Sequence, residues 1–222
     1  MRETVEVVRR LLAGETVSYQ GEFVHVDDVR LDVMHSPDRP RQIPILIGAS
    51  YMGMMELAAE IADGVLLNYL VPPAYNDDAL EHLERGASRA GRPLETVQRP
   101  QLILTAVSEF REEALQSAKL MLARYLRQAD HLGKISRAPR GLVEKIHEIV
   151  SWPARQEEVV RAAELIEVDY VEGIMAVGTP ADARAAVARY VEHGCTHPVL
   201  YPLGDPRLTI EAFHDWPTVR LD

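Results

Sequence analysis

Four short apolar runs, each separated from the next by sequence of helical character, most constrain the fold of this chain. The runs are Pro44–Ile47, Val65–Asn68, Leu102–Val107 and Pro198–Tyr201. Continuous runs of this kind, rich in β-branched residues, are typical of strands that are buried on both faces of a parallel sheet. Strands that alternate with helices indicate parallel pairing with right-handed crossovers. The sequence therefore predicts an α/β chain with about four parallel strands.

The helices expected between these strands have recognisable ends. The predicted ends are Ile61, Gly91, about Gln128 and Gly194. The last helix also has a clear start, because Thr179 is a strong N-cap, Pro180 suits the first helical position and Asp182 completes a capping box. We therefore expect this helix to be closed at its N-terminus by its own side chains.

Other parts of the chain lie outside this alternation. Residues 3–13 carry apolar residues at helical spacing, and residues 17–26 alternate around a Gln20-Gly21 turn. These patterns predict a helix followed by a β-hairpin. Residues 27–43 are polar and contain proline, as expected of a connecting loop. Residues 129–165 have helical character and no strand, which predicts a helical insertion.

The charge and cysteine content limit the partners and the compartment. Lys+Arg 24 against Asp+Glu 34 gives a net charge of −10, which disfavours nucleic acid and anionic membrane surfaces but not a small anionic ligand. No apolar run approaches the ~18 residues that a membrane span needs. The single cysteine, Cys195, excludes an intramolecular disulfide and fits a reducing compartment. We expect a cytoplasmic protein without nucleic-acid or membrane partners.

One segment carries a family resemblance. The stretch PILIGASYMGMMELAAEIADGVLLN (44–68) resembles the luciferase-like monooxygenase superfamily, in particular its deazaflavin-dependent branch. The segments VEVVRRLLAGETVSYQGEFVHV (5–26), VGTPADARAAVARYVEHG (177–194) and HPVLYPLG (197–204) support it by their order and approximate spacing. The resemblance extends over essentially the whole chain.

The resemblance implies TIM-barrel-type (β/α) units in a single luciferase-like domain over residues 1–222. Residues 129–165 would then be the helical insertion that this family places before its last strand. A closed barrel of this type typically has eight strands and about 250 residues. We therefore expect an incomplete barrel of about four parallel strands that lacks the N-terminal strands of the family.

The turn Gly48-Ala49-Ser50-Tyr51-Met52 is the candidate cofactor site. It lies between a predicted strand and the start of a helix, where free backbone N–H groups and the helix dipole favour a phosphate. The residues alone favour a simpler interpretation, with Gly48 in a tight turn and Ser50 as an N-cap. In the resembling family, however, the corresponding loop holds the phosphate of the flavin or deazaflavin side chain. The resemblance therefore favours cofactor binding by all five residues.

Asn68 ends a predicted strand, where active sites lie in barrels of this type. It is expected to contact the cofactor or substrate, although a turn-starting asparagine fits the same position. Asp63 and Gly64 are interpreted as structural, with Asp63 a solvated acid and Gly64 the C′ residue of the preceding helix.

His193, Cys195 and His197 offer two histidines and a thiol within five positions. A zinc site needs a fourth ligand, and none is evident in the sequence. The segment also passes from a helix end into a strand, and His193 suits the last turn of that helix. We therefore predict no metal site, and no nucleophilic role for Cys195.

The resemblance implies an oxidoreductase that uses coenzyme F-420, a deazaflavin, or alternatively FMN. The expected reaction on a small organic substrate is hydride transfer, or monooxygenation if FMN is bound. A second hypothesis is a catalytically silent remnant that binds flavin or only assembles with a partner. It arises because an open four-stranded sheet would expose two edges and an apolar face. For the same reason we expect a homodimer that covers the open sheet. No residue is identified as catalytic.

Overall fold

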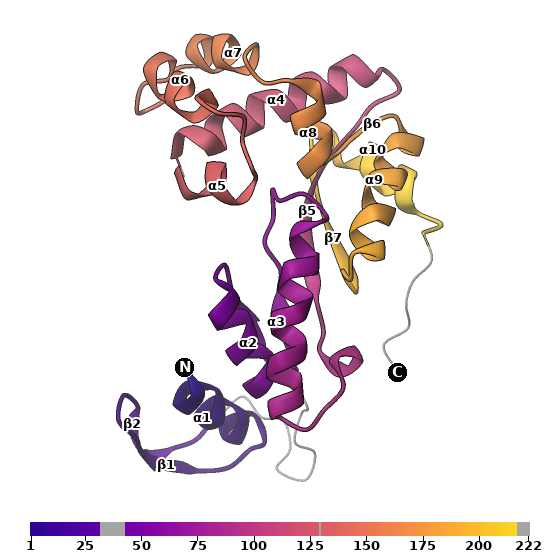
Figure 1. Ribbon diagram of the computed structural model, residues 1–222. Coiled ribbons are helices and arrows are strands. Elements are labelled where there is room, and N and C mark those ends of the chain that lie inside the picture. The colour runs from indigo at the N-terminus through magenta and orange to yellow at the C-terminus, as the bar shows by residue number, and fades with distance from the viewer. Residues whose placement is uncertain (32–42, 129, 217–222) are drawn as a thin grey trace. The chain divides into compact units, whose positions relative to one another are not determined.

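The alternation of strands and helices expected from the sequence is present in the computed structural model (Figure 1). The structure describes residues 1–31, 43–128 and 130–216, so most of the predicted loop 27–43 lies outside the described residues. The chain divides into an N-terminal unit, Met1–Leu66 with Glu81–Gln98, and a C-terminal unit, Leu67–Leu80 with the residues from Arg99 onward. Helix α3, Tyr75–Arg89, contributes residues to both units.

The N-terminal unit begins with a helix and a hairpin, as predicted. Helix α1 spans Arg2–Leu12, and the antiparallel strands β1 and β2 span Val17–Gln20 and His25–Val29. The turn differs from the prediction, because Gln20 pairs with His25 and the turn lies at 21–24. The carboxylate of Glu3 explains the longer turn. It accepts the amides of Glu22, Phe23 and Val24 at 2.9, 2.9 and 2.8 Å, and these donors lower the pKa of Glu3.

Two parallel strands flank the next helix of this unit. Strand β3 spans Leu46–Gly48, helix α2 Met52–Ile61 and strand β4 Gly64–Leu66. The two strands pair in register, with Ile47 opposite Val65. Helices α2 and α3 contribute fully buried side chains to the core of this unit, among them Met55, Ala58 and Leu83. The predicted strand–helix–strand order is confirmed.

Asp63 and Gly64 have structural roles, as predicted, but the particular roles assigned to them were wrong. Helix α2 ends at Ile61 with Ala62 as an extended C-cap, so Gly64 is a strand residue and not a C′ residue. A Cβ on Gly64 would lie 2.4 Å from the Gln98 carbonyl oxygen, so glycine is required by this close approach. Asp63 is only partly exposed, and its Oδ2 accepts the amide of Ile45 at 2.8 Å. The carboxylate thus fixes the start of β3.

The C-terminal unit is built on a three-stranded parallel sheet with strand order β6-β5-β7. Strand β5 spans Pro100–Val107, β6 Ala176–Gly178 and β7 His197–Leu203. Strand β6, only three residues long, was not predicted. Helices α9 (Pro180–Glu192) and α10 (Pro206–Phe213) cover the side of the sheet that carries Ile103 and Val107. Helix α10 was also not predicted.

The remaining helices of this unit gather around α4, as Figure 1 shows. They are α4 (Arg111–Gln128), α5 (Asp130–Ile135), α6 (Leu142–Ile149), α7 (Gln156–Ala163) and α8 (Val168–Ile174). Their core includes Leu122, Leu126 and Ile146, and it extends to Leu104 and Ala106 on β5. Helical structure between 130 and 163 was expected, and the described residues there contain no strand. Its origin as a family insertion stays a prediction.

The described strands form no closed barrel. The parallel pairs are β3-β4 in one unit and β6-β5-β7 in the other, so the α/β class and the parallel pairing are confirmed. Several strand side chains are exposed although they are apolar, namely Leu46 at 41%, Leu66 at 42%, Val199 at 45% and Tyr201 at 45%. Within the described part of the chain, no helix is both long and apolar enough to cross a membrane.

Candidate functional site

The turn between β3 and α2 is the part of the N-terminal unit that most resembles a ligand site. Strand β3 ends at Gly48 and α2 begins at Met52. Tyr51 is the N-cap, with extended backbone angles of φ −107° and ψ 137°, and no side chain caps the helix. The simpler interpretation of Ser50 as the N-cap is therefore wrong by one position.

The first amides of α2 have no partner within the described protein. The amides of Met54 and Met55 donate to the Tyr51 carbonyl at 2.9 and 3.1 Å. Those of Met52 and Gly53 donate to no described group, and the first turn carries no acidic residue. The partial positive charge of the helix start is thus neutralised by no side chain of that turn.

The other end of the same helix is closed by the protein itself. The guanidinium of Arg92 donates to the Ala59 carbonyl at 2.7 Å and also to the Ala62 carbonyl. An arginine that binds the last carbonyls satisfies the negative end of a helix. The described residues therefore include a partner for the C-terminal end of α2 but none for the amides of Met52 and Gly53 at its start.

The described residues leave space beside the two glycines of this segment. A Cβ placed on Gly48 or on Gly53 would meet no described atom within 4 Å. The side chain of Tyr51 is 82% exposed, so it does not pack across the turn, whereas Ala49 is buried beneath it. The five predicted residues from Gly48 to Met52 thus form one continuous turn that can approach an anionic group closely with its backbone.

Asn68 belongs to the C-terminal unit, where it lies in a buried polar network. Its side-chain Nδ2 donates to the Tyr75 hydroxyl at 2.8 Å, and its carbonyl accepts from Gln101 Nε2 at 2.8 Å. Gln101 Oε1 in turn accepts from Asn76 Nδ2 at 2.8 Å. Burial raises the pKa of Tyr75, so its hydroxyl stays protonated at neutral pH. The predicted contact of Asn68 with a cofactor stays a prediction.

Sequence reasoning missed the other members of this network. Asn76 and Gln101 are fully buried, although neither stands in a recognisable motif. The signal that could have found Gln101 is a polar residue directly before the apolar run of β5. Nearby, Leu70 has a positive φ of 53°, which is uncommon for a leucine and marks a constrained segment after β4.

The histidines and the cysteine of 193–197 have separate surroundings. His193 Nδ1 lies 2.7 Å from Asp77 Oδ1, and His197 Nδ1 lies 2.7 Å from the Thr196 hydroxyl. Burial raises the pKa of the Cys195 thiol to about 11, so the thiol is protonated at neutral pH and is a poor nucleophile. In the part of the chain that the structure describes, no three His, Cys, Asp or Glu residues are grouped to hold a metal ion.

The family of the chain follows from comparison with known proteins. The model of the family described as luciferase-like monooxygenase matches residues 1–197. The chain belongs to the luciferase-like monooxygenase family. The resemblance seen in the stretch 44–68 is thus confirmed over most of the chain.

Curated relatives include an enzyme that is named for its dependence on coenzyme F-420. The chain is 30% identical over 135 residues to a coenzyme F-420-dependent glucose-6-phosphate dehydrogenase from Nakamurella multipartita, with 60% of this chain and 38% of the relative covered. It is 33% identical over 123 residues to a 5,10-methylenetetrahydromethanopterin reductase from Archaeoglobus fulgidus, with 55% and 35% covered. The chain spans little more than a third of the length of these relatives.

Solved structures show the same fold. The coenzyme F-420-dependent tetrahydromethanopterin reductase from Methanopyrus kandleri matches with a TM-score of 0.74 at 24% identity, covering 96% of this chain and 60% of that one. A coenzyme F-420-dependent secondary alcohol dehydrogenase matches with a TM-score of 0.68 at 18% identity, covering 95% and 58%. The α/β fold therefore matches that of family enzymes, and these likenesses carry no further conclusion about the reaction.

Proposed function

We propose that this chain binds coenzyme F-420 through the Gly48–Met52 turn and acts as an oxidoreductase on a small organic substrate. The observation that carries the proposal is that the amides of Met52 and Gly53, at the start of α2, have no partner among the described residues. A phosphate is the anion that such a helix start favours, and the cofactor carries one in its side chain. The names of the relatives in the two comparisons support coenzyme F-420 over FMN.

The residues of this chain would hold and orient the cofactor, and the cofactor, when bound, would supply the chemistry of hydride transfer. The backbone from Gly48 to Met52 would hold the phosphate, and Ser50 and Tyr51 would lie next to it. We assign no catalytic residue. The hypothesis of a catalytically silent remnant is not favoured, because the named relatives are enzymes.

Titration with each cofactor tests the proposal. Purified protein is titrated with coenzyme F-420 and with FMN, and intrinsic fluorescence and the thermal midpoint are followed. We expect saturable binding of coenzyme F-420, with a rise in the midpoint, because a ligand that binds only the folded state stabilises it. Tighter binding of FMN would replace coenzyme F-420 by FMN in the proposal. No response to either cofactor would overturn it.

We further propose that Asn68 contacts the cofactor or the substrate. Asn68 lies two residues after the end of β4, on the carboxyl side where ligands of α/β enzymes bind, and its side chain donates to the Tyr75 hydroxyl. The variant Asn68→Ala should weaken coenzyme F-420 binding about tenfold, as expected for one lost hydrogen bond. The control Tyr75→Phe removes the same internal bond but keeps the amide. If both variants bind equally weakly, Asn68 acts only through its place in the network.

The third proposal is that two copies associate through β7. On the described residues, β7 pairs with β5 on one side only, and its Val199 and Tyr201 are both 45% exposed. Apolar strand faces and free edges are usually covered in native proteins. We expect a dimer in sedimentation, and a monomer for Tyr201→Lys. The control Ile210→Lys changes a residue of α10 that is 67% exposed, and it should leave the dimer intact. A monomeric wild type at micromolar concentration would contradict the proposal.

A further inference from the structure

The bend between α5 and α6 in the C-terminal unit encloses a pocket of about 540 Å³. It is lined chiefly by residues 133–147, with three cationic side chains among them. These are Lys134, Arg137 and Arg140, and the only carboxylate of the lining is Glu144. A local excess of positive charge is notable in a chain whose net charge is −10. An anion is the ligand that such a lining would attract.

Among the described side chains, Lys134, Arg137 and Arg140 meet no carboxylate within ion-pair distance, and all three are exposed. Other arginines of this unit are paired, since Arg111 binds Glu172 and Arg184 binds Asp215. The pocket cations are therefore available to a ligand, and a ligand would not have to break an existing bridge.

Backbone groups point to the same chemistry. Helix α6 begins at Leu142 after Gly141, which has a left-handed φ of 77° and provides no side-chain cap. The Leu142 amide donates to Pro139 and the Lys145 amide donates to Gly141, but the amides of Val143 and Glu144 donate to no described group. Both residues line the pocket. Two amides and three cations are thus gathered in one recess.

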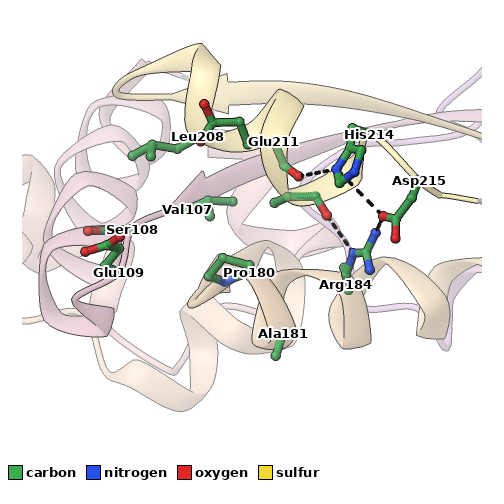
Figure 2. Close-up of a pocket in the computed structure, with 11 residues that line it drawn as sticks. Val107, Ser108, Glu109, Pro180, Ala181, Arg184, Leu208, Glu211, His214 and Asp215 are labelled. Carbon is green, nitrogen blue, oxygen red and sulfur yellow. Dashed lines mark hydrogen bonds and ion pairs between the residues drawn. The ribbon is translucent and has the colours of Figure 1, made fainter.

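Another recess of the same unit lacks these features. Figure 2 shows it between α9 and α10, with a volume of about 380 Å³. Its arginine, Arg184, donates to the Ala212 carbonyl at 2.6 Å and pairs with Asp215. The charge of Arg184 is already satisfied by the protein. This recess therefore offers no free cation to an anionic ligand.

We propose that the pocket between α5 and α6 binds a small phosphorylated metabolite. Guanidinium groups match the oxygens of a phosphate with paired hydrogen bonds, and the free amides at the start of α6 add further donors. A volume of about 540 Å³ exceeds that of a phosphate alone and leaves room for a short carbon skeleton. The site is separate from the turn at Gly48–Met52 and does not depend on the proposed cofactor.

Calorimetric titration of the whole chain at low ionic strength tests this site, with inorganic pyrophosphate and glycerol 3-phosphate as probes and acetate as a singly charged comparison. We expect saturable binding of both phosphate probes and none of acetate. The variant Arg137→Asn with Arg140→Gln should bind about tenfold more weakly or worse, because two charged donors are lost. Asparagine is chosen because Arg137 has a positive φ of 57°, which asparagine tolerates.

A matched control removes two cations that lie outside the pocket. Lys119→Gln with Arg161→Gln changes the net charge by the same amount and should leave the affinity unchanged. In the wild type, the amide resonances of Val143 and Glu144 should shift with pyrophosphate, which decides the question even if the pocket variant does not fold. The proposal is overturned if no saturable binding is seen, if both double variants weaken binding equally, or if those two resonances do not move.

Discussion

Two strand-to-helix junctions in this chain have the same order of elements but differ in whether side chains cap the helix. In each, a three-residue parallel strand ends on a glycine and a helix follows within a few residues. Strand β3 ends at Gly48 before α2, and β6 ends at Gly178 before α9. The start of α9 is closed by its own side chains, whereas the start of α2 is left open.

At the closed junction, the side chains of the first helical turn satisfy the helix start. Thr179 is the N-cap of α9, and Asp182 Oδ2 accepts its amide at 3.0 Å and its hydroxyl at 2.7 Å. Gly178 has a φ of 127°, and a Cβ there would lie 2.7 Å from Asp182 Oδ2. The glycine thus makes room for the cap. At Gly48 and Gly53 the corresponding space is empty.

This difference supports the proposal that the amides of Met52 and Gly53 bind a ligand. A serine, threonine or aspartate at an N-cap stabilises a helix by about 1 kcal/mol, and it is the common solution. At α2 the cap position holds Tyr51, whose exposed side chain caps nothing. The protein forgoes that stabilisation at the one helix start where the family resemblance expects a cofactor phosphate.

The largest expected effect on ligand affinity comes from placing a carboxylate in the first turn of α2. In the variant Gly53→Asp, a carboxylate in the first turn of α2 would repel a phosphate at the free amides and interact with them itself. We expect coenzyme F-420 affinity to fall at least about 100-fold, while the free energy of unfolding stays equal or rises, because an acid in the first turn favours the helix. Fluorescence titration and thermal unfolding measure the two quantities.

The neutral variant Gly53→Asn is the matched control, because it has the same shape without the charge. The space beside Gly53 is open, so neither side chain should be excluded by packing. Affinity for coenzyme F-420 should fall far less in Gly53→Asn than in Gly53→Asp. Equal losses in the two variants would mean that bulk, and not charge, is what the turn excludes, and the phosphate assignment would fail.

The second prediction contrasts the two glycines. Gly178→Ala places a Cβ at a positive φ and against Asp182, and should lower the free energy of unfolding by about 2 kcal/mol. Gly48→Ala meets no atom within 4 Å, and its φ is not in the left-handed region, so the change in stability should be below about 0.5 kcal/mol. Denaturant unfolding of both variants checks the pair. A larger loss for Gly48→Ala would show that its turn is packed after all.

Sequence reasoning found the helix start of the closed junction completely and that of the open junction in part. The capping box at Thr179 and Asp182 was predicted, because the two residues that bond to each other are only three positions apart and are of the types that form such a box. At α2 the turn was located, but the N-cap was misplaced by one residue. Serine is a common N-cap residue, whereas in the structure the N-cap of α2 is Tyr51. No residue pattern in the sequence predicts that the amides at the start of a helix will have no partner among the described residues.

The same distinction explains the other differences between prediction and structure. Strands β3, β4, β5 and β7 were found from their apolar runs, whereas β6 was not predicted although it is as long as β3 and β4. The roles of Glu3 and Asp63 depend on partners many positions away, the turn amides of 22–24 and the amide of Ile45. Local pattern identifies an element, but a carboxylate that binds a distant backbone is visible only once the chain is folded.

The smallest effect concerns the charge in the closed junction. The hydroxyl and the amide of Thr179 donate to Asp182 and lower its pKa below the ordinary value. Because the folded pKa is below the unfolded one, this stabilisation is fully present above the unfolded pKa and is lost as the pH falls through the folded pKa. Asp182→Asn should therefore cost about 0.5–1 kcal/mol at neutral pH, an effect limited by the exposure of the side chain.

The cost of Asp182→Asn should shrink toward zero in acid, where the wild-type carboxylate is also uncharged. Unfolding curves of the two proteins between neutral pH and about pH 3 measure this convergence. Asp169→Asn, in the first turn of α8, serves as the control, because no described hydrogen bond holds that carboxylate. Its effect should be smaller at neutral pH. If Asp182→Asn cost the same at every pH, the junction would be held by the shape of the side chain, and the contrast with the open start of α2 would no longer be one of charge.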